Sequence, residues 1–242
     1  MIPSLAPLFC GPLAEHAEKL QLTNSQAPTL AGSVLFQARY FGEFIGTLAE
    51  RHATHDLLAL TSLWSKWYFS TFMASSMAAN LLLQRSLPIG LDDIGVVLST
   101  QDRPLALHLP NDGSALLPGP PFERFQTLIE AHLAPTIEVF AEVSRASPRL
   151  FWSNAGNTFE FVTTRIELHP LAKPGCSAPA RAVLESRLRP DGRRNPLFAP
   201  VHYRNQGTDE PLRLRRICCI RYRLPGVGYC SSCPLDRDKQ PD

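Results

Sequence analysis

The sequence predicts an α+β protein with a mostly helical body, a small antiparallel β-hairpin or sheet, and a C-terminal cysteine segment. Three observations carry this prediction. Apolar residues recur at helical spacing over most of the chain, short apolar runs interrupt them near residues 92–118, and four of the six cysteines lie between residues 218 and 233. With 242 residues, of which 44% are hydrophobic and 19% charged, the chain can build an ordinary globular core. A net charge of +2 gives no bulk attraction to nucleic acid.

The first two predicted helices lie in residues 34–53 and from about residue 57 to Gln84. The first is amphipathic, and Asp56 is placed to cap the second, which Pro88 and Gly90 end. Residues 67–83 carry no charge and are just long enough to span a bilayer. Their Ser, Thr and Ala content favours a buried helix, and Trp64 and Trp67 are expected in the core instead of a ligand site.

The next segment changes to strand-like patterning. Two short apolar runs, 94–100 and 105–109, are separated by Thr-Gln-Asp-Arg-Pro, and Asn-Asp-Gly follows at 111–113. This pattern predicts a small antiparallel hairpin, with a third strand at 115–117.

Helical spacing returns from Pro121 to Ser144, where Pro135 is expected to kink the helix. Two further helices are predicted over 149–168 and 178–188, and the chain becomes loop-like from Pro190. We therefore expect a helical body over residues 1–206, with a β insert near 92–118, followed by a cysteine segment over 207–242.

The cysteine segment follows the pattern C-C-x10-C-x2-C, formed by Cys218, Cys219, Cys230 and Cys233. Soft thiolates select soft or borderline metals and iron–sulfur clusters, and four thiolates complete the ligand set of a [2Fe–2S] cluster. A turn at Pro225–Gly228 is expected to bring the second pair of thiols against the first.

Other uses of four thiols remain open at this point. A closed zinc site is the main alternative, although zinc modules usually present two pairs that each contain a gap. A disulfide ranks third, and a Rieske-type centre is disfavoured because it needs two histidines, the nearest of which is His202. The N-terminus lacks the basic start of a secretory signal, so a reducing cytoplasm is expected, which favours metal ligation. Cys10 and Cys176 are expected to be ordinary thiols.

Arginines surround the cysteines, at positions 204, 213, 215, 216, 221 and 223. One hypothesis is that Arg215, Arg216, Arg221 and Arg223 dock the substrate or steer an acidic electron donor. The alternative is that these arginines only keep a strand soluble. Trp152 and Asn154, near a helix start, are further candidates for a substrate pocket.

The run RRICCIRYRLPGVGYCSSCP (215–234) closely resembles the C-terminal signature of the FhuF-type siderophore-iron reductases. Weaker resemblance extends to Trp-Ser-Lys-Trp at 64–67, Phe-Trp-Ser-Asn-Ala-Gly-Asn at 151–157 and Asn195-Pro-Leu-Phe. It thus covers most of the chain, although only the cysteine motif is highly specific. The resemblance implies a [2Fe–2S] cluster held by Cys218, Cys219, Cys230 and Cys233. It also implies a cytoplasmic oxidoreductase that reduces ferric siderophores, typically hydroxamates, delivered by an ABC importer, with a peripheral location at the inner membrane face left open.

The chain carries no G-x-G-x-x-G and no phosphate loop, so the electron is expected to come from a small reductant or from another protein, such as a ferredoxin or flavodoxin. One-electron reduction of a chelated iron needs no general base or covalent step, so no catalytic residue beyond the cluster is expected. The alternative function is a non-enzymatic protein that uses the same cysteines to bind zinc or to sense redox state.

Overall fold

The computed structural model describes residues 1–23, 29–205, 207 and 210–235. The α-helices are α1 (Gly32–Leu35), α2 (Ala38–Arg51), α3 (Leu57–Leu82), α4 (Pro121–Arg124), α5 (Ala134–Ser144), α6 (Pro148–Arg165) and α7 (Ala178–Glu185). A π-helical stretch covers Thr127–Leu133, and short 3-10 helices cover Pro3–Leu8, Gly11–His16, Ile166–Leu168 and Arg221–Arg223. The strands are β1 (Leu20–Leu22), β2 (Leu30–Ala31), β3 (Arg85–Ser86), β4 (Gly95–Leu98), β5 (Pro104–Leu109), β6 (Ser114–Ala115), β7 (Val201–Arg204) and β8 (Leu212–Arg215).

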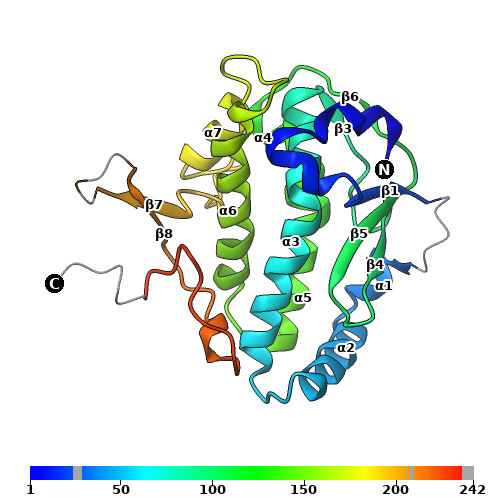
Figure 1. Ribbon diagram of the computed structural model, residues 1–242, viewed down its shortest axis with the longest axis vertical. Coiled ribbons are helices and arrows are strands. Elements are labelled where there is room, and N and C mark those ends of the chain that lie inside the picture. Colours follow the sequence, from blue (N-terminus) through cyan, green and yellow to red (C-terminus); the bar gives the residue numbers. More distant parts are fainter. Residues whose placement is uncertain (24–28, 206, 208–209, 236–242) are drawn as a thin grey trace.

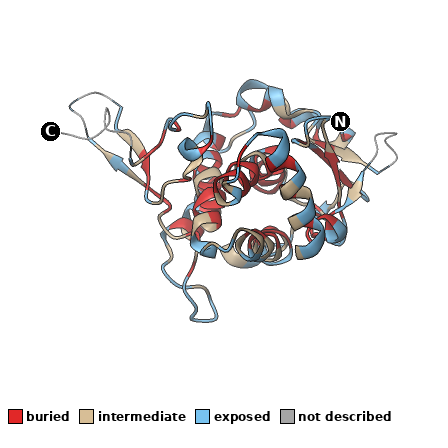
Figure 2. Ribbon diagram, turned by 90° about the horizontal axis from the view of Figure 1, so that it is seen from below, coloured by how far each residue is buried: buried red, intermediate tan, exposed pale blue. Residues whose placement is uncertain are grey.

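Helix α3 runs through the centre of the molecule and packs against α2, α5, α6 and β5 (Figure 1). Its N-terminus is capped as predicted, because the Asp56 carboxylate accepts a hydrogen bond from the Ala59 N–H at 2.9 Å. Most of its residues are buried, and the buried positions gather in the interior of the helix bundle (Figure 2). Among the described residues, no helix combines the length and the apolar character needed to cross a bilayer. The prediction of a buried core helix is therefore confirmed.

Aromatic side chains fill the core around this helix. Trp64 and Tyr68 stack with ring centroids 5.3 Å apart, and Phe41 and Phe140 contact Trp64 edge-on. Trp64 is fully buried, as expected for a core residue. Trp67 is partly exposed, and the Arg103 guanidinium lies 4.3 Å from the centre of its ring. The core is thus one continuous aromatic and aliphatic cluster that spans the helical body.

A four-stranded sheet with the order β1-β5-β4-β2 lies on one side of the bundle. The predicted β4–β5 hairpin is present, and β2 extends it antiparallel, whereas β1 pairs with β5 in parallel. The predicted third strand was assigned to the wrong sheet, because β6 pairs with β3 at the end of α3. Strands β1 and β2 were not predicted.

The helix predicted over 121–144 is present as three consecutive helical pieces. Pro135 lies at the start of α5, directly after the π-helical stretch. Since proline has no N–H, it leaves the carbonyl of Ala131 without its helical partner. The backbone N–H of Leu91 donates to that carbonyl at 3.1 Å, which ties the loop before β4 to this helix.

The chain after α7 leaves the bundle and forms the antiparallel β7–β8 hairpin, on the opposite side from the four-stranded sheet (Figures 1 and 2). Sequence reasoning assigned this region to loops. The buried carboxylate of Glu160 on α6 anchors the hairpin by accepting hydrogen bonds from Arg213 Nε at 2.7 Å and from the Tyr203 hydroxyl. The expected domain boundary after residue 206 lies between these paired strands, and the cysteine segment follows β8 directly.

Candidate metal centre

The four cysteines of the C-terminal motif lie together as two sulfur pairs. Cys218 Sγ is 3.9 Å from Cys233 Sγ, and Cys219 Sγ is 3.8 Å from Cys230 Sγ. Two thiolates that share one tetrahedral ion at about 2.3 Å lie roughly 3.8 Å apart, so each pair has the spacing of two ligands to one metal. Within the described part of the chain, no three or more His, Cys, Asp or Glu side chains are arranged to hold a single ion. The two sulfur–sulfur distances therefore allow one metal ion at each pair.

The backbone around the cysteines explains how the pairs meet. Ile220 has a φ of +51°, an unfavourable conformation for a β-branched residue, and it reverses the chain directly after Cys219. This turn points the Ile220 N–H at Cys218 Sγ, at 3.3 Å. A second tight turn, closed by the Cys233 N–H and the Cys230 carbonyl at 3.0 Å, places the later cysteines. The expected approach of the two cysteine pairs is thus confirmed.

The two sulfur pairs have different neighbours. Backbone N–H groups of Ile220 and Leu235 donate to Cys218 and Cys233, at 3.3 and 3.4 Å. The other pair lies deeper, and Lys66 Nζ of α3 donates to Cys219 Sγ at 3.6 Å. Hydrogen bonds to cluster sulfurs, nearby charges and solvent exposure all influence the potential of an iron–sulfur centre.

These contacts shift the acid–base behaviour of the thiols. Hydrogen bonding with Cys218 and Cys230 holds the pKa of Cys219 well below its usual range, and the charges of Lys66 and Arg215 act in the same direction. The hydrogen bond with Cys219 raises the pKa of Cys218 and of Cys230.

Arg215 is the most unusual residue of the site, because its side chain is fully buried. Its Nη2 donates to Asn154 Oδ1 and, at 3.3 Å, to Ser153 Oγ. Its Nε and Nη1 have no hydrogen-bond partner among the described residues. Burial lowers the pKa of the guanidinium, and the thiolates of Cys219 and Cys230 oppose that effect.

A buried cation with two unused N–H groups is costly unless an anion lies beside it. A [2Fe–2S] cluster on four thiolates is a negatively charged group that offers sulfur acceptors. The residues present therefore fit such a cluster: two correctly spaced thiol pairs, backbone N–H donors, and a buried cation with free donors.

Helices α3 and α6 hold the cysteine segment through small polar side chains. Ser62 Oγ donates to the Cys219 carbonyl at 2.8 Å, and Ser153 Oγ donates to the Ile217 carbonyl at 3.3 Å. Asn154 Nδ2 donates to Ser62 Oγ at 3.0 Å and to Ser65 Oγ at 2.9 Å. Sequence reasoning missed the roles of Ser62, Ser65, Lys66 and Ser153, although three of them fall within the resembling segments 64–67 and 151–157.

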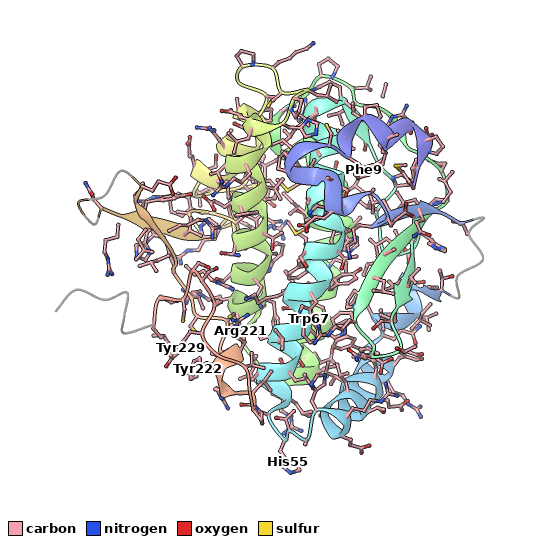
Figure 3. All side chains as sticks on the ribbon, in the orientation of Figure 1. Phe9, His55, Trp67, Arg221, Tyr222 and Tyr229 are labelled. Carbon is pink, nitrogen blue, oxygen red and sulfur yellow. The ribbon has the colours of Figure 1, made fainter. Side chains whose placement is uncertain are left out.

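The structure corrects part of the expected docking surface. Arg215 and Asn154 are buried, so they act inside the protein and are not available to a partner. Arg223 pairs with Asp56 at 2.7 Å, and Arg221 donates to the carbonyls of Gly228 and Tyr229. These two arginines fold the segment around Tyr222 and Tyr229, whose rings lie side by side with centroids 4.9 Å apart (Figure 3). Arg216 is exposed, and it shares with Trp152 the wall of a large cavity.

Comparison with known proteins agrees with this geometry. Residues 62–210 match the family described as ferric iron reductase FhuF-like transporter, and residues 215–235 match the FhuF 2Fe-2S C-terminal domain, which indicates a [2Fe–2S] cluster. The chain is 28% identical over 178 residues to the ferric siderophore reductase of Escherichia coli (strain K12). That alignment covers 73% of this chain and 65% of the relative's length.

Solved structures show a likeness in fold. Aerobactin synthetase IucA from a hypervirulent pathotype of Klebsiella pneumoniae, with or without ATP, matches with a TM-score of 0.53 at 15% identity. The match covers 73% of this chain and 38% of the synthetase. Since the family model spans more than half of the sequence and a second model covers the cysteine segment, the chain belongs to the FhuF-like ferric iron reductase family.

Proposed function

We propose that this protein is a ferric-siderophore reductase whose cluster is held by Cys218, Cys219, Cys230 and Cys233. The proposal rests on one observation: two pairs of cysteine sulfurs lie near the buried Arg215, which has two unused hydrogen-bond donors. The name of the Escherichia coli relative supports the activity. We also propose that residues 1–206 form the supporting body and 207–242 the redox segment.

A bound [2Fe–2S] cluster would supply one electron at a time, and one electron converts chelated Fe(III) to Fe(II). The chain's own residues fix the four sulfurs, offset their negative charge and separate most of them from water. Of the four cysteines, Cys218 is the most exposed, so electrons are expected to leave through the Cys218–Cys233 side. Since hard oxygen donors suit Fe(III) better than Fe(II), the reduced complex releases its iron.

We further propose that the substrate is a hydroxamate siderophore, that iron is released in the cytoplasm, and that a ferredoxin or flavodoxin restores the electron. Delivery by a siderophore ABC importer would place the protein at least transiently near the membrane. The alternative, a zinc-binding or redox-sensing protein, is not favoured, because residues 215–235 match the FhuF 2Fe-2S C-terminal domain.

Release of Fe(II) from a ferric hydroxamate tests the activity. Anaerobically reduced protein is mixed with the chelate and a ferrous indicator, and about one Fe(II) per reduced cluster is expected in a single turnover. Cys230→Ser should abolish both the visible absorption and the release, because it removes one ligand. Cys10→Ser is the matched control, since Cys10 is exposed and outside the motif. An iron-loaded protein that leaves the chelate oxidised would refute the function.

A further inference from the structure

A cavity of about 850 Å³ lies next to the cysteine segment. Three parts of the chain form its walls: the first turns of α6, the stretch from residue 187 to 200, and the two residues that precede Cys218. Its volume falls in the range of pockets that bind small molecules, roughly 300–1,000 Å³. The side chains that matter here are those of Arg149, Trp152, Arg187, Arg194, Phe198 and Arg216.

The cavity carries a strong positive charge. Four arginines and no acidic residue line it, and none of the four guanidinium groups pairs with a carboxylate among the residues that the structure describes. Neighbouring arginines behave differently. Arg189 pairs with Glu130 at 2.6 Å, and Arg193 pairs with Asp191 at 2.5 Å. Uncompensated charge is therefore concentrated on the cavity and is not general to this stretch of chain.

Two of the four guanidinium groups are held in place at the cavity wall. Arg216 Nε donates to the Ala199 carbonyl at 2.7 Å, and the guanidinium of Arg187 lies 5.4 Å from the ring centre of Phe198. Neither contact neutralises the charge. Both leave N–H donors for a ligand, and arginine forks suit carboxylate and other planar oxygen anions.

Two lining residues connect the cavity to the cysteine motif. Ile217 lines the cavity and directly precedes Cys218. Ser153, another lining residue, donates to the Ile217 carbonyl and accepts from the buried Arg215. A ligand in the cavity would therefore contact the residue that precedes Cys218 in the chain and the serine that accepts a hydrogen bond from Arg215.

We propose that this cavity binds the substrate and that the substrate is a ferric chelate with net negative charge. This inference rests on the proposed reductase function. In a simple trishydroxamate the three ligand groups cancel the charge of Fe(III), so the neutral complex gains little from four arginines. A hydroxamate chelate that also bears free carboxylates keeps a negative charge, as does a tricatecholate. Both chelates carry their net negative charge on oxygen atoms, which the arginines bind while Trp152 contacts the apolar part.

Binding of redox-inert gallium(III) chelates to the oxidised, cluster-loaded protein tests the inference without any electron transfer. Three chelates are compared by calorimetry: a neutral trishydroxamate, a hydroxamate with free carboxylates, and a tricatecholate. At least one of the anionic chelates should bind about tenfold more tightly than the neutral one, and the affinity should fall as salt rises. The stronger anionic ligand identifies which oxygen chemistry the site uses.

Charge-removing variants locate the site. Arg194→Gln and Arg149→Gln should each weaken the anionic chelate on the order of tenfold and leave the neutral one unchanged. Arg193→Gln, next in sequence to Arg194 but outside the cavity lining, should behave like the unmodified protein. Iron content and visible absorption of each variant verify folding.

Equal affinity for neutral and anionic chelates, or equal effects of Arg194→Gln and Arg193→Gln, would overturn the inference. The outcome is separable from the proposed function. If the protein binds neutral and anionic chelates equally but still reduces ferric chelates, only the anionic binding site is refuted. If the protein binds anionic chelates selectively but reduces none of the ferric chelates, the anionic binding site is supported and the reductase function is refuted.

Discussion

The helical body and the cysteine segment are stabilised by different means. The body buries a continuous cluster of aromatic and aliphatic side chains around α3. Within residues 216–233 of the segment, the cysteines form the only buried cluster, apart from single apolar contacts. Polar side chains of α3 and α6, chiefly Ser62, Asn154 and Ser153, join the two regions. From this difference we predict that the body folds without metal, while the order of the segment depends on metal binding.

Removing the iron should give the largest difference between the two regions. Structural metal sites in small modules contribute on the order of 10 kcal/mol to folding. Hydrogen exchange of the apoprotein should therefore show rapid exchange of amides in residues 215–235, with α3 and α6 as protected as in the loaded protein. Loss of protection throughout the chain would show that the body also depends on the metal.

Trp64→Ala should have the converse effect. Trp64 is fully buried and contacts five aromatic rings of the body, so its truncation is expected to cost about 3–5 kcal/mol of unfolding free energy. Because α3 carries Ser62 and Lys66, both regions should be weakened together in urea denaturation. Leu117→Ala, at a side chain 81% exposed, is the control and should change stability by less than about 0.5 kcal/mol. An unchanged midpoint for Trp64→Ala would contradict the described core.

The pH dependence of the body should come largely from His132. Its Nδ1–H donates to the Ile89 carbonyl, and its Nε2 accepts from the Tyr68 hydroxyl at 2.8 Å, so the neutral ring is fully hydrogen-bonded. Burial lowers its pKa to about 4, against 6.5 in the unfolded chain. A depressed pKa gives stability that is complete above about pH 6.5 and is lost as the pH falls toward 4, by roughly 3 kcal/mol in all.

Urea denaturation of the apoprotein at several pH values measures this loss. His132→Gln should be less stable at pH 7.5 but should show a smaller decline between pH 6.5 and 4. The same slope in both proteins would contradict the role of His132.

Arg215→Gln should give the smallest free-energy change, but one confined to the junction of the two regions. Loss of charge-assisted hydrogen bonds to the cluster is expected to cost about 2 kcal/mol of cluster binding and to lower the reduction potential, since a cation favours the more negative reduced state. Lys66→Gln, at 3.6 Å from Cys219, should lower the potential in the same direction while leaving the buried contacts of Arg215 intact. Unchanged potentials in both variants would contradict the electrostatic role of these residues.

Sequence reasoning succeeded where local pattern decides the structure. Helical spacing located α2, α3 and α6, and the motif spacing with its Pro-Gly turn predicted the approach of the cysteine pairs. It failed where contacts between segments far apart in the sequence determine the structure. The parallel pairing of β1 with β5 joins residues more than 80 positions apart, and strands of two or three residues are too short to show a pattern.

The arginines near the cysteines show the same limit at the site. Their sequence pattern is that of a solvent-exposed basic surface, yet Arg215 is buried and Arg223 is paired with Asp56 at the start of α3. Lys66 reaches Cys219 across 153 positions, which no local pattern reveals. The cavity arginines at 149, 187 and 194 come together only in the fold.

Metal analysis and electron paramagnetic resonance of the reduced protein would show whether the two sulfur pairs hold a two-iron cluster. We expect two irons and two acid-labile sulfides per chain, and one unpaired electron per reduced cluster that is lost in Cys219→Ser. One zinc ion per chain, with no sulfide and no resonance signal, would contradict this expectation.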